Sequence, residues 1–250
     1  MADTPTPLLS ARGINIAFGG VVAANGIDLD ILPDENLAII GPNGAGKTTF
    51  LNICTGYLKP QAGSVRYAGT ELLGQYPRAI TRLGIARAFQ IPQLFTEHTV
   101  LENMLLSAAV RERAWNPFRS LHALPQRNEM LELLDLVDCA DIVNRSAAEL
   151  SEGQRKLVDI AIALALKPKL LLMDEPTSGV ASGDKFRIME ILIEALRKAG
   201  VASVFVEHDM EMVTRYASRV AVWSDGRIQT QGPPAEVMND PEVIRTVIGV

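Results

Sequence analysis

A glycine-rich stretch carries the clearest chemical signal in this sequence. Residues 41–48 read GPNGAGKT and match the pattern GxxxxGK[ST], whose glycines let backbone N–H groups surround phosphate oxygens. In such a loop Lys47 reaches the β- and γ-phosphates, and the hydroxyl of Thr48 can ligate Mg²⁺. Average residue frequencies give a chance match a probability of only about 0.01 over the whole chain. The stretch therefore predicts a phosphate-binding loop rather than a plain glycine-rich turn.

Two carboxylates follow an apolar run in the second half of the chain. Asp174 and Glu175 come directly after residues 170–173, which read LLLM. The carboxyl end of a buried strand is the edge at which α/β sheets bind ligands. Asp174 would hold Mg²⁺ through water, and Glu175 would polarise the attacking water as a general base. Alone, the pattern is equally typical of a structural strand-to-turn step; together with the phosphate loop it favours the catalytic role.

A third motif, residues 150–154, reads LSEGQ and precedes a helical stretch. Ser151 and Gln154 have the spacing of a capping box, which satisfies backbone groups at the start of a helix. Two interpretations stay open from these residues. One is simply a well-capped helix; the other is that Ser151 and the N–H of Gly153 hold a γ-phosphate at the helix N-terminus.

The strands that must position these motifs follow from hydrophobic periodicity. Ile27, Leu29 and Ile31 alternate with acidic residues, which predicts a half-buried strand in a first region that is mostly strand. Short apolar runs at 37–40, 170–173 and 202–206 predict strands that are buried on both faces. Asp225 and Gly226 form a strong hairpin signal between two further strands.

Helical spacing dominates the middle of the chain. From residue 100 to about residue 166 the apolar residues form helical stripes, interrupted by an irregular segment at 115–120. This pattern predicts a helical lobe inserted into an α/β core. A later helix over 185–198 should end at Gly200, and short helices are expected around 234–238 and 241–248.

Composition narrows the class of protein. The 250 residues are 48% hydrophobic with a net charge of −5, which excludes a disordered tail, a collagen-like chain or a disulfide-rich miniprotein. The acidic balance gives no general reason to bind nucleic acid. Cys54 and Cys139 lie far apart and are expected to be reduced structural thiols. Without a basic, apolar leader or an uninterrupted apolar span, we expect a soluble chain that reaches a membrane only through a partner.

Five features occur in the order found in one large family. The phosphate loop, Gln90, LSEGQ, LLLMDEP and Glu207-His208-Asp209 resemble the motifs of the ATP-binding cassette (ABC) ATPases of membrane transporters. The resemblance spans the chain from about Leu8 to Gly249. In detail it looks most like the branched-chain amino acid import ATPases and the related urea and amide importers. Residues 17–20, 88–90, the irregular insertion and the ending at 240–245 support this likeness.

The resemblance implies a P-loop NTPase fold, an α/β core with an N-terminal antiparallel β subdomain and an inserted helical subdomain. Residues 1–90 and 167–232 would form the ATP-binding core and β subdomain. Residues 91–166 would form the helical, or signature, subdomain, and residues 233–250 a C-terminal helical tail.

The resemblance also implies roles for single residues. Phe18 would stack on adenine, although a strand aromatic is an equally good explanation without the family. Gln90 would sense Mg²⁺ and the water, His208 would contact the γ-phosphate, and these two with Glu175 form the expected catalytic set. The expected Mg²⁺ ligands are Thr48, Gln90 and Asp174. The expected ATP contacts are Phe18, Gly41, Pro42, Asn43, Gly44, Ala45, Gly46, Lys47, Thr48 and Thr49, with Ser151, Glu152, Gly153 and Gln154 covering ATP on a partner chain.

The implied partners follow from the transporter family. Two cassettes, identical or different, would meet head to tail and pass their motion to two transmembrane permease subunits, through the groove near Gln90, Phe95 and the helical lobe. A periplasmic or extracellular solute-binding protein would take part indirectly, and no nucleic acid is expected. The chain would lie in the cytoplasm, peripheral to the cytoplasmic face of the cell membrane.

Two residues depart from the family pattern. Glu152 replaces a glycine of the usual LSGGQ, and it would repel a γ-phosphate if its side chain pointed inward. Ala181 stands where an Asp or Asn usually helps to couple the two sites. Three other readings stay open: a cassette of another membrane machine such as an exporter or lipid extractor, a soluble cassette acting on DNA or ribosomes, and a non-catalytic nucleotide-binding module.

Overall fold

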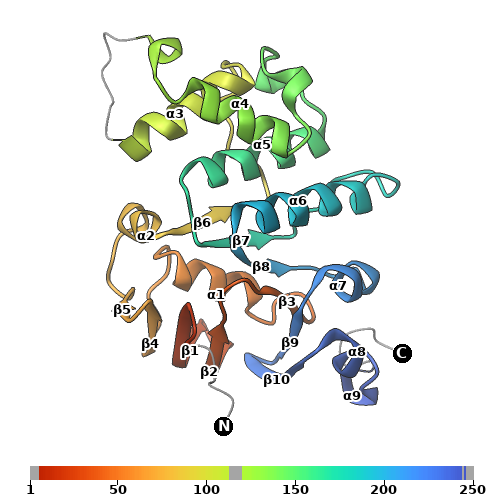
Figure 1. The fold of residues 1–250 in the computed structure, drawn as a ribbon. Helices are drawn as coiled ribbons and strands as arrows, with labels where there is room; N and C mark the ends of the chain where they lie inside the picture. The colour runs from red at the N-terminus through yellow and green to blue at the C-terminus, as the bar shows by residue number, and fades with distance from the viewer. Residues whose placement is uncertain (1–5, 113–119, 244, 246–250) are drawn as a thin grey trace.

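The computed structural model describes residues 6–112, 120–243 and 245. A helical lobe, a central sheet with its helices, and a second sheet follow one another from top to bottom in Figure 1. The irregular segment expected at 115–120 lies outside the described residues except for Ser120, and the helix expected over 241–248 is described as α9 (Pro241–Val243). No helix in the described part is long and apolar enough to cross a membrane.

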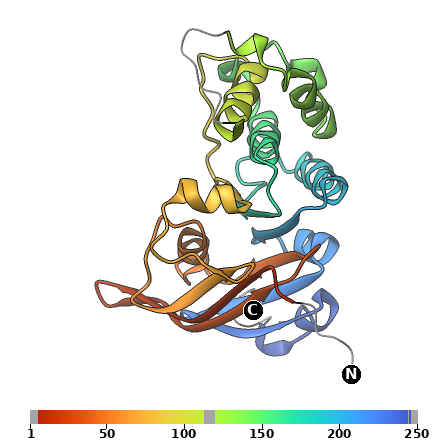
Figure 2. The same cartoon turned by 60° about the vertical axis from the view of Figure 1, so that its left-hand side comes forward.

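The first part of the chain forms a four-stranded antiparallel sheet. Its strands are β1 (Leu9–Phe18), β2 (Val21–Ile31), β4 (Ala62–Tyr67) and β5 (Thr70–Glu71), in the spatial order β2-β1-β4-β5. Ile27, Leu29 and Ile31 are buried, whereas the acidic residues between them are exposed or half-buried. This alternation confirms the predicted half-buried strand. Figure 2 shows the sheet along the lower side of the molecule, far from the helical lobe.

The central sheet has six strands and carries the phosphate-loop motif. They are β3 (Asn36–Ile40), β6 (Ile85–Ala88), β7 (Leu170–Asp174), β8 (Ala202–Val206), β9 (Arg219–Ser224) and β10 (Arg227–Gly232), in the order β10-β9-β3-β8-β7-β6. All pairs are parallel except β9 with β10. Asp225 and Gly226 join that pair at φ 50° and 71°, the positive values that a two-residue type I′ hairpin requires. The carboxyl ends of β3, β7 and β8 therefore meet at one edge.

Helices cover both faces of this sheet. Between it and the antiparallel sheet lies α1 (Lys47–Cys54), and α2 (Pro77–Leu83) packs beside β6. On the other face lie α6 (Lys185–Ala199), which ends at Gly200 as predicted, and α7 (Met210–Tyr216). The short α8 (Pro234–Val237) packs against β9 and β10. The helical lobe consists of α3 (Val100–Glu112), α4 (Arg127–Leu136) and α5 (Glu152–Ala165), with short 3₁₀ turns at Leu121–Ala123, Ala140–Ile142 and Ala147–Glu149.

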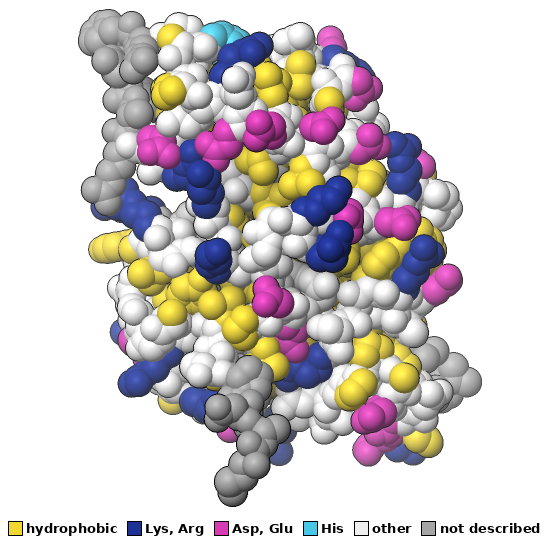
Figure 3. Space-filling view, in the orientation of Figure 1, with side chains coloured by type: hydrophobic (Ala, Val, Ile, Leu, Met, Phe, Trp, Pro, Cys, Tyr) yellow, Lys and Arg dark blue, Asp and Glu magenta, His cyan; other side chains and the backbone are white. Residues whose placement is uncertain are grey.

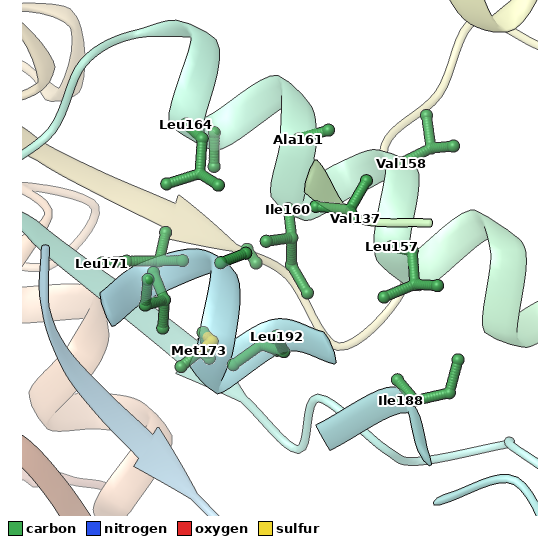
Figure 4. Packing of buried hydrophobic residues seen from close by; sticks show 14 of the residues in the cluster. Val137, Leu157, Val158, Ile160, Ala161, Leu164, Leu171, Met173, Ile188 and Leu192 are labelled. Carbon is green, nitrogen blue, oxygen red and sulfur yellow. The ribbon is translucent and has the colours of Figure 1, made fainter. Parts of the chain in front are cut away.

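Side chains on the two faces of the central sheet enter different hydrophobic cores. On β7, Leu171 and Met173 join the core of the helical lobe and α6, whereas Leu170 and Leu172 join the core of α1 and the antiparallel sheet. Figure 4 shows the first core, in which side chains of α5, β7 and α6 lie close together. Since each fully buried aliphatic side chain contributes about 1.5–3 kcal/mol, α5 fastens the helical lobe firmly to the sheet.

Both cysteines are buried and unpaired, as predicted. Cys54 belongs to α1, and Cys139 lies between α4 and the following 3₁₀ turn. Burial raises the pKa of the Cys54 thiol strongly, and it raises the pKa of Cys139 to about 12. Neither sulfur is therefore present as the reactive thiolate near neutral pH.

Candidate active site

The phosphate-loop motif connects β3 to α1 at the carboxyl edge of the central sheet. A cavity of about 140 Å³ is lined there by Asn43, Gly44, Gly46, Lys47, Thr48, Thr49, Glu175 and Val206. The Lys47 side chain is almost fully buried, and its Nζ donates hydrogen bonds to the carbonyl oxygens of Gly41 at 2.7 Å and Pro42 at 2.9 Å. The loop is closed further by a hydrogen bond from the Ala45 N–H to the Pro42 carbonyl, at 3.3 Å.

Electrostatics at this loop favour an anion. Burial lowers the pKa of Lys47, while the carboxylates of Glu175 and Asp174 oppose that shift. The helix α1 begins at Lys47, so its N-terminal N–H groups and the positive end of its dipole face the same cavity. A buried ammonium group and a helix N-terminus therefore converge on a space that phosphate groups can fill.

The two glycines that the motif specifies, Gly41 and Gly46, are required by close packing. A Cβ at Gly41 would lie 1.8 Å from the carbonyl oxygen of Trp223, and a Cβ at Gly46 would lie 1.8 Å from that of Ala23. Their φ angles of 148° and 109° are also unfavourable for other residues. The loop thus lies flat against β9 and β2, a reason for glycine that the phosphate argument alone does not give.

Asp174, the last residue of β7, receives hydrogen bonds from two sides. Thr48 Oγ1 donates to Asp174 Oδ1 at 3.2 Å, and Arg87 of β6 donates to Oδ2 at 3.2 Å. The side chains of Arg87 and Asp174 are only 7% and 4% exposed. Arg87 also bonds Asn52 and Thr55 of the α1 segment, and its guanidinium lies 5.0 Å from the centre of the Phe89 ring. Burial lowers the pKa of Arg87, whereas Asp174 opposes the shift.

Glu175 lies directly beyond the strand and connects the other two expected catalytic residues. Gln90 Nε2 donates to Glu175 Oε2 at 2.8 Å, and Nε2 of His208 lies 2.9 Å from Glu175 Oε1. The backbone of Glu175 has a φ of 49°, which residues other than glycine rarely adopt, and its N–H donates to the Val206 carbonyl at 3.1 Å. The structure therefore brings Gln90, Glu175 and His208 together beside the phosphate-loop cavity.

A second carboxylate, that of Glu207, binds the backbone at His208. The Glu207 side chain is 5% exposed; its Oε1 accepts a hydrogen bond from Thr177 Oγ1 at 2.7 Å, and its Oε2 accepts one from the backbone N–H of His208 at 3.2 Å. The next residue, Asp209, caps α7 by accepting from the N–H groups of Glu211 and Met212. His208 is thus held at the start of α7 by its two acidic neighbours.

The expected Mg²⁺ ligands have suitable chemistry. Hydroxyl, carboxylate and amide oxygens are the hard donors that Mg²⁺ prefers, and Thr48 and Asp174 are already in contact. In the described residues, no group of three or more His, Cys, Asp or Glu side chains forms a metal cage. Mg²⁺ at phosphate sites commonly takes one or two carboxylates and completes its shell with phosphate and water. The donor set at Thr48, Asp174 and Gln90 fits an ion that enters with a nucleotide.

The LSEGQ motif begins α5 and lies apart from the phosphate loop. Ser151 is the N-cap: its Oγ accepts from the N–H of Gln154 at 3.3 Å, and its own N–H donates to Gln154 Oε1 at 3.1 Å. This is the predicted capping box. All four residues of the expected signature line another cavity, of about 730 Å³, with Gly179, Val180 and Ala181. None of the residues that line this cavity also lines the phosphate-loop cavity.

Two of the expected contacts, Phe18 and Glu152, and the departure at Ala181 have distinctive positions. Phe18 ends β1 with 48% of its surface exposed, and it does not line the phosphate-loop cavity. The Glu152 side chain lies over Gly179, where an added Cβ would come within 3.2 Å of Glu152 Cγ. Ala181 is exposed in the same loop, and its carbonyl oxygen accepts a hydrogen bond from the Asp184 N–H.

Sequence reasoning missed three charged residues behind the site: Arg87, Lys156 and Asp159. The Lys156 Nζ donates to the carbonyl oxygens of Gln90 and, at 3.4 Å, of Glu175. Asp159 Oδ2 accepts from the N–H of Phe89 at 3.2 Å. Burial lowers the pKa of Lys156 and raises the pKa of Asp159 to about 6. The available signal was a charged residue in an otherwise apolar strand or helix.

Comparison with known proteins was made once this geometry was established. A family model described as "ABC transporter" matches residues 24–178, more than half of the chain. The High-affinity branched-chain amino acid transport ATP-binding protein LivG of Escherichia coli (strain K12) is 33% identical, over 97% of this chain and 98% of its own length. The Probable branched-chain amino acid transport ATP-binding protein LivG of Methanocaldococcus jannaschii is 35% identical over the whole of both chains.

Solved structures give the same result for the fold. The ADP conformation of MJ1267, an ATP-binding cassette of an ABC transporter, superimposes with a TM-score of 0.84 and 32% identity. The match covers 98% of this chain and 100% of that structure. The expected fold class, an α/β core with an antiparallel sheet and a helical lobe, is confirmed.

Proposed function

The chain belongs to the ABC transporter family of ATP-binding proteins, and we propose that it is the ATP-hydrolysing subunit of an importer for branched-chain amino acids or related small polar solutes. The observation that carries the proposal is the contact of Glu175 with Gln90 and His208 beside the phosphate-loop cavity. The similarity of this chain to LivG proteins over nearly its whole length supports branched-chain amino acids or related solutes as the transported class.

In the proposed reaction, water attacks the γ-phosphorus of ATP and the bond to the bridging oxygen of ADP breaks. Glu175 accepts a proton from the attacking water as the general base. Lys47 and the N-terminus of α1 bind the phosphates, since both already face the cavity. Gln90 and His208 hold the Glu175 carboxylate from two sides and so orient it. Mg²⁺, held through Thr48, Asp174 and Gln90, would neutralise phosphate charge.

We propose that the complete site needs two chains. Ser151, Glu152, Gly153 and Gln154 line a cavity that shares no residue with the phosphate-loop cavity, which supports a site in which these two surfaces come from different chains. A head-to-tail pair would place the start of α5 of one chain over the ATP of the other and exclude water. The second chain is either another copy or a different cassette. The position of Glu152 against Gly179 supports an arrangement in which its carboxylate stays off the γ-phosphate.

We propose that the permease subunits dock beside α2 and α3. A cavity of about 400 Å³ lies there, and its lining includes Arg78, Arg82, Lys169 and the exposed Val110. Figure 3 shows Lys and Arg side chains with hydrophobic ones near them between the helical lobe and α2, at the left of the view. Phe95, in the segment that follows Gln90, is 62% exposed and offers a second apolar contact to a permease. A permease loop with acidic and apolar side chains would complement such a surface.

The remaining parts of the proposal follow from the importer class. The cassette would be peripheral on the cytoplasmic face of the cell membrane, where ATP is available. A periplasmic or extracellular solute-binding protein would deliver the solute to the permeases without touching this chain. The solute would therefore be selected by those partners.

Affinity purification tests the proposal. The tagged chain is isolated from detergent-solubilised membranes of its own organism, and the proteins that accompany it are identified by mass spectrometry. We expect two polytopic permeases and a cassette partner. Recovery of ribosomal proteins or nucleic acid without any membrane protein would overturn the importer assignment, and permeases of an export system would reassign the chain to another transporter class.

A further inference from the structure

A lysine in the helix that starts with the LSEGQ motif binds the backbone of two of the expected catalytic residues. Lys156 is in the second turn of α5 and is only 2% exposed. Its ammonium group donates to the carbonyl oxygen of Gln90 and to that of Glu175, the latter at 3.4 Å. A buried ammonium group is costly unless it is hydrogen-bonded and paired, and here these two carbonyl oxygens supply the hydrogen bonds. The carboxylates of Glu152, Asp159, Glu175 and Glu207 oppose the fall in the Lys156 pKa that burial causes.

The two carbonyl oxygens belong to residues whose side chains also meet. Gln90 Nε2 donates to Glu175 Oε2 at 2.8 Å on the side of the phosphate-loop cavity. Gln90 follows β6, whereas Glu175 follows β7, so neither backbone is held by the other through a strand ladder at this point. Lys156 thus links the backbone at Gln90 directly to the backbone at Glu175. The contact between the side chains of these two residues depends on the distance between their backbones.

A second charged residue of α5 fixes the same segment. Asp159, three residues after Lys156, is buried and accepts a hydrogen bond from the backbone N–H of Phe89 at 3.2 Å. Residues three apart lie on one side of a helix. The N–H of Phe89 and the carbonyl of Gln90 are therefore both bound by one face of α5, which leaves this short segment little freedom to rotate.

We propose that Lys156 is a positioning residue for hydrolysis, which sets the spacing of Gln90 and Glu175 by binding both main-chain carbonyls. The proposal rests on the proposed function of the site. Lys156 is not among the residues that line the phosphate-loop cavity, so it acts through Gln90 and Glu175. An error of about 1 Å in the placement of a catalytic group can cost about 100-fold in rate. The loss of Lys156 should therefore lower kcat and leave nucleotide affinity nearly unchanged.

The test compares Lys156→Met, which keeps the apolar stem and removes the ammonium group, with the unmodified protein. We expect kcat for MgATP to fall about 10- to 100-fold, in line with a misplaced catalytic group, while KM and the Kd for MgATP change less than about threefold. In the nucleotide-free protein, hydrogen exchange should accelerate at the backbone amides of Phe89, Gln90, Ile91 and Gln93. Ser107→Ala is the matched control, because it removes another hydrogen bond to α5, which goes to the Ile162 carbonyl and not to Gln90 or Glu175.

Chemical rescue separates positioning from general damage. Lys156→Ala leaves space for a small alkylammonium ion, so added propylammonium should restore part of the lost kcat, and the same salt should not affect Ser107→Ala. Should Lys156→Met not fold, Lys156→Gln retains an amide NH₂ donor group on a shorter side chain and should show an intermediate kcat with normal affinity. A wild-type kcat in Lys156→Met, or in Lys156→Ala without propylammonium, overturns the proposal, and so does an equal loss of kcat and affinity without rescue.

Failure of the proposed function gives a different result. The unmodified protein and Glu175→Gln are measured in the same series. The assigned hydrolysis is wrong if the unmodified chain, with its partners, does not hydrolyse ATP. It is also wrong if Glu175→Gln does not abolish the hydrolysis that is seen. If that turnover is present and Lys156→Met matches it, only the role of Lys156 is wrong.

Discussion

The imidazole Nε2 of His208 lies 2.9 Å from Oε1 of Glu175. The second carboxylate oxygen is bound by Gln90, so both oxygens of Glu175 already have partners. Such bonds hold a carboxylate in one orientation, which a general base needs.

Glu175→Gln should bind MgATP but hydrolyse it slowly. The amide is isosteric with the carboxylate yet cannot accept the proton from water, and general-base catalysis contributes about 100- to 10,000-fold. We expect kcat to fall by such a factor, with an ATP-dependent dimer detected by light scattering after gel filtration. Hydrolysis at the unmodified rate would show that Glu175 is not the base.

Lys47→Ala should weaken nucleotide binding. Its ammonium group is the buried cation of the phosphate-loop cavity, and hydrogen bonds to charged groups contribute about 1.5–3 kcal/mol. In a Glu175→Gln background, which prevents turnover, calorimetry should give a Kd for MgATP that is about 10- to 100-fold higher. Lys198→Ala removes an exposed lysine of α6 and serves as the control. Equal affinities in the two variants would contradict the use of Lys47 for phosphate binding.

Arg87→Met should destabilise the fold far more than the loss of a surface cation. It leaves the buried Asp174 carboxylate without its ion-pair partner, which typically costs about 3–5 kcal/mol. Arg187→Met is the comparison, because Arg187 and Asp138 form an exposed ion pair expected to contribute less than about 1 kcal/mol. Urea unfolding at one pH measures both free energies. A similar small loss in the two variants would mean that burial adds nothing to the Arg87–Asp174 pair.

Asp159→Asn should change the pH dependence of stability. The Asp159 pKa is about 6 in the folded chain, against a reference value of 3.8, so the folded state holds this proton more tightly. The contribution of Asp159 to the free energy of unfolding therefore falls as pH rises from about 4 to about 6 and stays low above that. We expect the variant to gain about 2 kcal/mol relative to the unmodified protein between pH 4.5 and pH 7.5. A difference that does not change with pH would place the Asp159 pKa near its ordinary value.

Local sequence signals predicted much of the fold because the interactions behind them are local. The capping box of Ser151 and Gln154 spans three residues, and the Asp225-Gly226 turn needs only two positive φ angles. The helix α2 was missed although Pro77 at its first position and Gly84 after its end are ordinary helix signals. The strand β6 was missed because Arg87 interrupts its apolar run.

The residues behind the site could not be found in this way. Arg87 and Asp174 are 87 residues apart in the chain, and Lys156 is 66 residues from Gln90. Each is a charged group in an apolar element, and only the folded chain shows which opposite charge or carbonyl oxygen stabilises it. The phosphate-loop glycines show the same limit, because the carbonyl oxygens that exclude a Cβ at Gly41 and Gly46 come from β9 and β2.

The two cysteines make the chain a convenient host for optical probes. Both are buried, the whole sequence contains no others, and thiol reagents act on exposed thiolates. A cysteine introduced at the exposed Ala181 would therefore be the single labelling position on each protomer. Donor and acceptor dyes attached there on separate protomers would turn the proposed head-to-tail pairing into an energy-transfer signal, followed in real time as ATP is added.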